Sequence, residues 1–202
     1  MVNGGAKLLV AGLLAAMPTV ATAQDAAALL DELKKSMGNA PEAVRISAAG
    51  SGYRPSTAEA SGREHFRIEA HTQDLDPRAD PAVLWTTPHG FLAGATSRAA
   101  TVADETLMGT TYRVVSFTGP HGRTVKGYVT DQNLLERIRT EVVDPTRGKV
   151  QFEAVFMSWV DFAGVKYPSV IIHRENDEVS RILIVDQLEP ISAAATPVRT
   201  GE

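Results

Sequence analysis

The chain contains no cysteine in its 202 residues, which excludes disulfide bonds and lipid attachment through a cysteine. It also lacks an excess of positive charge, because 20 Lys and Arg residues face 24 Asp and Glu residues. The formal net charge of -4 argues against a nucleic-acid partner. Beyond the N-terminal region, no apolar run approaches the roughly 20 residues of a membrane-spanning helix. We therefore expect a soluble product without stable membrane insertion.

The chain also lacks the residue clusters on which most enzyme chemistry depends. It contains no G-x-S-x-G sequence for a nucleophilic serine and no glycine-rich phosphate-binding loop. Its histidines are isolated from one another at His65, His71, His89, His121 and His173. Two-zinc hydrolases need a dense H-x-H-x-D-H cluster instead. We therefore predict no catalytic residue, no metal site and no cofactor, and we expect the chain not to be an enzyme.

Residues 1–23 have the pattern of a Sec-type signal peptide. Lys7 precedes a leucine- and alanine-rich run, and a small-residue cleavage site of Ala, Thr and Ala ends at Ala23. An uncleaved anchor is the alternative, but the apolar run is short and Pro18 interrupts it. We expect an exported, periplasmic protein with one domain over residues 24–190 and a flexible tail over residues 191–202.

The most informative part of the chain is residues 150–188, which predict three consecutive strands. Runs rich in Val, Ile and aromatic residues are separated by turn signals, first Ala163 with Gly164 and then Asn176 with Asp177. Two-residue hairpin loops at these positions would make the three strands antiparallel neighbours in one sheet.

The first of these hairpin loops fixes a register that the charges support. It would set Asp161 opposite Lys166 and Glu153 opposite Arg174, so that opposite charges meet across the strand pair. Each such pair contributes only a few tenths of a kcal/mol to about 1 kcal/mol, so the pairs report the register more than they enforce it.

The register divides the apolar side chains between two faces of the sheet. One face would carry Phe152, Ala154, Phe156, Val160, Phe162, Val165, Tyr167, Ile171, Ile182, Ile184 and Leu188, and the other would carry Val155, Met157, Trp159, Val170, Ile172, Val179, Leu183 and Val185. Since both faces are apolar in the middle, the sheet must be covered on both sides or curve around something apolar. The candidate cavity-lining residues are Phe152, Phe156 and Ile171 on one face, or Met157, Trp159 and Ile172 on the other.

The rest of the chain supplies more strands and few helices. We predict helices at residues 25–37 and 89–99, strands at 44–53, 63–75 and 83–85, a loop at 74–81 and a hairpin formed by 112–117 and 125–130. Residues 133–143 fit a helix or a strand equally well. The sum predicts an α+β fold, a curved antiparallel half-barrel of roughly eight or nine strands with one or two helices on its concave face.

Three stretches resemble a known family: TPHGFLAGA at residues 87–95, GYVTDQNLLERI at 127–138 and DFAGVKYPS at 161–169. They are similar to the β-rich region that precedes the catalytic domain of exported metallo-β-lactamase-fold hydrolases. That region is similar in layout to the periplasmic lipoprotein-localisation carriers, or LolA-like proteins, whose curved sheet and helices enclose an apolar cavity. The resemblance covers residues 85–190, and it implies a strand at residues 134–142. The hydrolase half of the family is missing from this chain.

These features support more than one function. The leading hypothesis is a non-enzymatic carrier that binds an apolar small molecule, a lipid or a lipidated chain. The alternative is an accessory domain that docks on a separately encoded envelope hydrolase through its second apolar face, and a third reading is a remnant enzyme. The simplest structural explanation is that the same apolar residues are a plain core beneath the N-terminal helix.

Overall fold

The computed structural model of the chain describes residues 23–38, 43–52, 64–71, 85–119, 122–144 and 146–191. The expected signal peptide, apart from Ala23, the loop at residues 74–81 and the tail beyond Ile191 lie outside the described residues. These three assignments therefore stay predictions.

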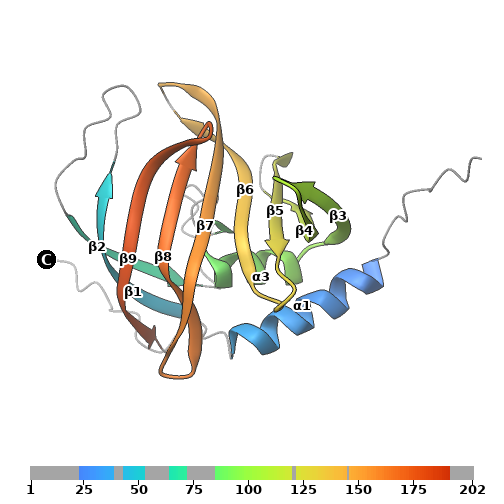
Figure 1. Cartoon of the computed structure of the whole chain (residues 1–202), viewed down its shortest axis with the longest axis horizontal. Helices are drawn as coiled ribbons and strands as arrows, with labels where there is room; N and C mark the ends of the chain where they lie inside the picture. The colour runs from blue at the N-terminus through green and yellow to red at the C-terminus, as the bar shows by residue number, and fades with distance from the viewer. Residues whose placement is uncertain are drawn as a thin grey trace, which may run out of the picture.

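The described strands form one antiparallel sheet of nine strands in the order β2-β1-β9-β8-β7-β6-β5-β4-β3. Their bounds are β1 Ala43–Gly52, β2 Glu64–His71, β3 Thr101–Leu107, β4 Thr110–Thr118, β5 Thr124–Val129, β6 Leu135–Asp144, β7 Gly148–Phe162, β8 Val165–Glu175 and β9 Glu178–Ile191. β3 to β9 follow one another as a meander, and β1 then pairs with β9. Figure 1 shows the sheet curving around α3, which confirms the α+β half-barrel.

The first helix, α1, spans Ala23–Met37 and packs by a stripe of apolar side chains. Leu29, Leu33 and Met37 lie four residues apart on one helix face, and all three are buried. Gly38 follows with a positive φ of 81° and forms a backbone bridge to Val165. The predicted helix and its glycine stop are therefore confirmed, because a left-handed residue after the helix favours glycine.

The second long helix, α3, spans Pro88–Thr96 and lies against the sheet. Thr87 caps it by accepting a hydrogen bond from the Gly90 amide, and Pro88 occupies its first turn. A side chain at Gly127 of β5 would come within 2.3 Å of the Phe91 ring, so the absence of one lets α3 approach the strand closely. The predicted short helix is confirmed.

The expected strand at residues 83–85 is wrong at Trp85, and its other residues lie outside the described ones. Trp85 has helical backbone, and its ring meets Phe117 edge-on at 5.7 Å between centroids. A side chain at Gly119 would collide with the Trp85 ring, and one at Gly94 would collide with the Phe117 ring. The backbone conformation at Trp85 is therefore determined by side-chain packing between α3 and the sheet rather than by strand pairing.

The β7–β8 hairpin has the predicted register throughout. Asp161 pairs with Lys166 and Glu153 with Arg174. Ala163 and Gly164 both have positive φ values, 53° and 89°, as a tight turn between twisted strands requires. The Asp161 carboxylate oxygen Oδ1 accepts a hydrogen bond of 2.7 Å from the Gly164 amide.

The predicted faces of β9 are wrong where the strand meets β8. The pairing shifts by one residue between His173 and Arg174, so Ile171 lies opposite Leu183 rather than Ile182. A shift of one residue turns every later side chain to the other face. Leu183 and Val185 therefore join Phe156 on the buried face, whereas Ile184 is 43% exposed.

The predicted faces are also wrong near the end of β7. Ser158 has a φ of 54°, which interrupts the alternation of a regular strand. The Trp159 ring meets the Phe156 ring at 6.3 Å and packs against the main core, although the two residues were predicted on opposite faces. Val160, predicted on the Phe156 face, is 40% exposed.

Elsewhere the strand predictions hold, with one omission. β1, the part of the predicted strand 63–75 that forms β2, and the β4–β5 hairpin are confirmed, and β6 confirms a strand where periodicity alone was ambiguous. Residues 63 and 72–75 lie outside the described residues. No strand was predicted at Thr101–Leu107, which forms the edge strand β3.

Candidate functional site

The inner face is the side of the sheet that packs against α1 and α3. One row of it crosses three strands, because Phe156 pairs with Ile171 and Ile171 pairs with Leu183. All three side chains are buried and belong to the main hydrophobic cluster, which also contains residues of both helices. Phe152, Trp159 and Phe162 pack at the border of this cluster and are only partly buried. The inner face therefore combines a closed apolar centre with an aromatic rim.

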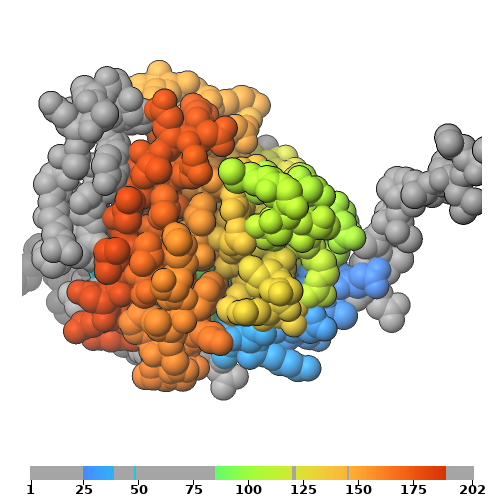
Figure 2. All heavy atoms as spheres, viewed as in Figure 1, coloured from blue at the N-terminus to red at the C-terminus, as the bar shows by residue number. Residues whose placement is uncertain are grey.

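The other side of the same three strands also carries apolar residues, which we call the outer patch: Val155, Met157, Val170, Ile172, Ile182 and Ile184. They form two cross-strand rows, Val155 with Ile172 and Ile182, and Met157 with Val170 and Ile184. Figure 1 draws α3 behind the sheet, and in Figure 2 β7, β8 and β9 lie at the front without a helix over them. Met157 is 48% exposed. The outer patch is thus apolar but open.

The six predicted cavity residues divide between these faces. Phe156 and Ile171 lie in the buried centre of the inner face, and Phe152 lies on its rim. Trp159, predicted on the second face, also lies on the inner rim. Met157 and Ile172 belong to the outer patch. The structure therefore brings four of the six residues together and leaves two on the opposite side.

A pair of polar aromatic residues lies between α3 and the sheet. His89, in the first turn of α3, stacks on Tyr167 of β8 with ring centroids 5.6 Å apart and an angle of 5° between the rings. The exposed fraction is 3% for His89 and 0% for Tyr167. Among the residues that the structure describes, none forms a hydrogen bond with either imidazole nitrogen of His89 or with the Tyr167 hydroxyl.

Burial keeps both rings of this pair uncharged. It lowers the pKa of His89 to about 4 and raises the pKa of the Tyr167 hydroxyl. The sequence placed Tyr167 on the same face as Phe156. It placed His89 at the start of a predicted helix, where an imidazole could cap the helix or accept a ligand group, with an exposed surface histidine as the simpler interpretation.

The outer side of β6 and β7 carries a charged network centred on Glu153, which is 5% exposed. Its carboxylate lies 2.7 Å from Arg139, 3.3 Å from Arg137 and 3.9 Å from Arg174. Arg174 is the partner that the register predicted. Three cations around one carboxylate hold these strands together and leave the outer side of the sheet polar next to the outer patch.

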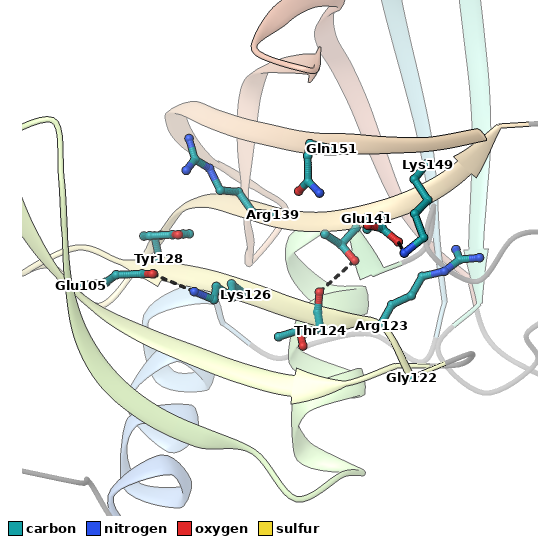
Figure 3. Close-up of a pocket in the computed structure, with 11 residues that line it drawn as sticks. Glu105, Gly122, Arg123, Thr124, Lys126, Tyr128, Arg139, Glu141, Lys149 and Gln151 are labelled. Atoms are coloured by element: carbon teal, nitrogen blue, oxygen red, sulfur yellow. Dashed lines mark hydrogen bonds and ion pairs between the residues drawn. The ribbon is translucent and has the colours of Figure 1, made fainter. Parts of the chain in front are cut away.

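A hollow of about 520 Å³ lies on the outer side of the sheet, over β5, β6 and β7. Figure 3 shows charged and polar side chains around it, with Lys126 paired to Glu105 at 2.7 Å and Lys149 paired to Glu141 at 2.9 Å. Its volume suits a small molecule. Its lining does not suit hydrocarbon, so this hollow is not the candidate site for an apolar ligand.

A smaller groove of about 240 Å³ lies between the two helices. Its lining is mainly aliphatic, with Ala26, Ala27, Leu30, Ala95, Ala99 and Ala100 beside Asp31, Thr96 and Arg98. It is smaller than the roughly 300–1,000 Å³ of typical ligand pockets. We describe it as a seam between α1 and α3.

Two further observations concern metals and membranes. Among the residues that the structure describes, no group of three or more His, Asp or Glu side chains is arranged to hold a metal ion. No helix in that part of the chain is both long enough and apolar enough to cross a bilayer.

No protein-family model matches the chain, and no curated protein matches it in sequence. Its fold is similar to that of LolA superfamily protein NE2245 from Nitrosomonas europaea, with 11% identity, a TM-score of 0.51 and coverage of 83% of this chain and 94% of that one. It is also similar to a putative outer membrane lipoprotein-sorting protein domain from Vibrio parahaemolyticus, with 9% identity, a TM-score of 0.51 and coverage of 83% and 93%. At this identity the likeness shows the fold alone. The chain has a LolA-like fold, whereas the association with metallo-β-lactamase-fold hydrolases stays a hypothesis.

Proposed function

We propose that the protein is a periplasmic, non-enzymatic carrier that holds a lipid or a lipidated chain against the inner face of its sheet. The observation that carries this proposal is the aromatic rim of Phe152, Trp159 and Phe162, which is partly exposed next to a closed apolar centre. The LolA-like fold supports it, and one protein of that fold is described as a lipoprotein-sorting domain.

Such a site works by removing hydrocarbon from water and needs no catalytic group. Each buried methylene contributes about 0.8 kcal/mol, so an acyl chain of about twelve methylenes gains on the order of 10 kcal/mol before the costs of association. The interior must open to accept a chain, because the centre of the inner face is packed. The partly buried rim is where we expect the chain to enter.

The test is the uptake of a fluorescent fatty-acid probe by the purified mature protein. Trp159→Asp places a carboxylate on the inner rim, and we expect it to weaken binding at least about ten-fold, which is roughly 1.4 kcal/mol. Met157→Asp makes the same chemical change two residues away in the outer patch, and we expect it to leave binding unchanged. Phe156→Asp is a poor test, since a charge in a fully packed position would unfold the protein.

Two results would overturn the carrier proposal. One is the absence of both probe uptake and co-purifying lipid. The other is equal loss of binding in the Trp159 and Met157 variants. Circular dichroism and thermal melting of each variant separate loss of binding from loss of folding.

The outer patch favours a second function, that of an accessory domain for another envelope protein such as a separately encoded hydrolase. An apolar patch on an open sheet face often marks a protein interface. The Met157→Asp variant also tests this second function, because the substitution changes the outer patch and not the inner face. It would abolish the capture of an envelope partner while probe uptake persists.

Export is the remaining part of the proposal and depends on residues 1–23. Expression of the full chain in a Gram-negative host should give a periplasmic product whose first residue is near Gln24. A product that keeps Met1 and stays in the cytoplasm would contradict the assignment.

A further inference from the structure

We propose that His89 and Tyr167 form the polar end of the ligand site and bind the neutral ester or amide group of an acyl ligand. This inference rests on the proposed carrier function and adds the chemical class of the ligand. The two residues come from different layers of the fold, the first turn of α3 and the beginning of β8. A ligand held between helix and sheet would meet both.

The polar atoms of this pair have no hydrogen-bond partner in the part of the chain that the structure describes. Three buried polar atoms, Nδ1 and Nε2 of His89 and Oη of Tyr167, lie in two stacked rings without a hydrogen bond. Buried polar groups in folded proteins are almost always hydrogen-bonded, and an unpaired one is costly. Three such atoms in one place indicate a position prepared for a polar group from outside the chain.

The hydrogen-bonding capacity of the pair decides which polar group would fit. The neutral imidazole offers one donor and one acceptor, and the phenol offers a donor and an acceptor. Tyr167 belongs to the main hydrophobic cluster, where an uncompensated charge would be expensive. An ester or amide is uncharged, its carbonyl can accept from the phenol or the imidazole, and its neighbouring atoms are hydrocarbon. A free carboxylate or phosphate would have to lose its hydration without meeting a cation.

A ligand can reach these groups only by separating the layers that cover them. The atoms are covered by both helices, because α3 lies on the sheet with Phe91 over Gly127 of β5, and α1 packs against β8. The polar group must therefore enter between α3 and β8 and take the place of the contact between the two rings. Filling the unpaired positions of His89 and Tyr167 offsets part of the cost of separating the layers.

The experiment measures displacement of Nile red from the mature protein by three matched ligands: dodecane, methyl dodecanoate and dodecanoate. We expect methyl dodecanoate to displace the dye at a concentration about five-fold lower than either of the others, the effect of one net hydrogen bond. Tyr167→Phe and His89→Phe should each reduce that ester preference while dodecane binds as before. Tyr128→Phe removes another buried phenol, on the outer side of the sheet, and should leave the preference intact.

The outcomes separate this inference from the carrier function. If no ligand displaces the dye, the carrier function itself is wrong. If dodecane and its ester bind equally to the unaltered protein, or if the Phe variants keep the ester preference, the polar end is wrong although the carrier stands. Thermal melting gives an independent check, because Tyr167→Phe removes an unpaired hydroxyl and should not lower the Tm. A clear fall in Tm would show that the hydroxyl is already paired within the protein, which overturns the inference.

Discussion

The inner and outer faces of β7, β8 and β9 are similar in composition but differ in what covers them. Phe156 and Ile171 on the inner face are buried beneath the helices, whereas their sequence neighbours Met157 and Ile172 lie on the outer patch. Hydrophobicity along these strands is therefore not enough to locate a core. The position of α1 and α3 decides which apolar row is buried and which stays open.

The two faces also differ in the partners of their buried polar side chains. On the outer side, Glu153 is buried but surrounded by arginines. On the inner side, His89 and Tyr167 are buried, and their polar atoms have no hydrogen-bond partner in the described ranges. In the described part of the chain Glu153 Oε2 and Arg137 Nε also make no hydrogen bond, but both groups lie in ion pairs, whereas the inner pair has neither a hydrogen bond nor an ion pair there. We therefore place recognition of a neutral ligand group on the inner side.

The largest expected effect on stability comes from truncating one apolar side chain on each face and comparing the two losses. Phe156→Ala should lower the free energy of unfolding by about 3–5 kcal/mol, because it leaves a cavity in the packed centre. Met157→Ala, its exposed neighbour, should cost less than about 1 kcal/mol. Urea unfolding followed by circular dichroism measures both. Similar losses for the two variants would mean that the outer patch is as tightly packed as the inner face.

The second prediction concerns pH and the inner pair. Burial lowers the pKa of folded His89 to about 4 from its ordinary value of 6.5. The stability that depends on neutral His89 is therefore fully present above pH 6.5. It is lost as the pH falls from 6.5 to about 4, which lowers the free energy of unfolding by about 3 kcal/mol in total. The unfolded chain binds the proton first, so acid favours unfolding.

The measurement is the free energy of unfolding of the unaltered protein and of His89→Phe at about pH 7 and about pH 4. The unaltered protein should lose about 3 kcal/mol more than the variant over this range. His173, whose pKa burial and Arg181 also lower to about 4, contributes equally in both proteins and cancels in the comparison. Identical pH dependence in the two proteins would show that His89 is hydrated in the folded state.

A smaller effect is expected on the outer side. Glu153→Gln removes the charge that three arginines share and should cost about 2 kcal/mol of stability. Glu141→Gln breaks a pair with Lys149, whose side chain is 76% exposed, and should cost less than about 1 kcal/mol. Thermal melting at low and high salt would compare the two. Equal and strongly salt-dependent losses would mean that Glu153 is no better protected from solvent than Glu141.

The sequence predicted best where structure is set by neighbours in the chain. The β7–β8 register followed from the turn at Ala163 and Gly164, because a two-residue loop leaves one pairing. The helix α1 followed from its apolar spacing and the glycine after it. Residues 133–143 were ambiguous by periodicity, and a family resemblance rather than physical reasoning identified β6.

The prediction of strand faces failed where a single residue changes the alternation of side chains between the two faces of the sheet. The shift in β9 beside His173 and the positive φ at Ser158 are set by how long twisted strands fit together, and no turn residue announces either. The edge strand β3 was missed because only Val102 among its residues is buried, so no alternation is visible. The burial of His89 depends on Tyr167, which is far away in the sequence, so local patterns could not reveal that pair.

The most direct test of the inner-face proposal is NMR of the methyl groups of β8 and β9 with a spin-labelled fatty acid. Ile171 and Leu183 point to the inner face, and Ile172 and Ile184 point to the outer patch, so adjacent residues report on opposite sides of one sheet. The account predicts that the label broadens the methyl signals of Ile171 and Leu183 and spares those of Ile172 and Ile184. Broadening confined to Ile172 and Ile184 would place the ligand on the outer patch and contradict it.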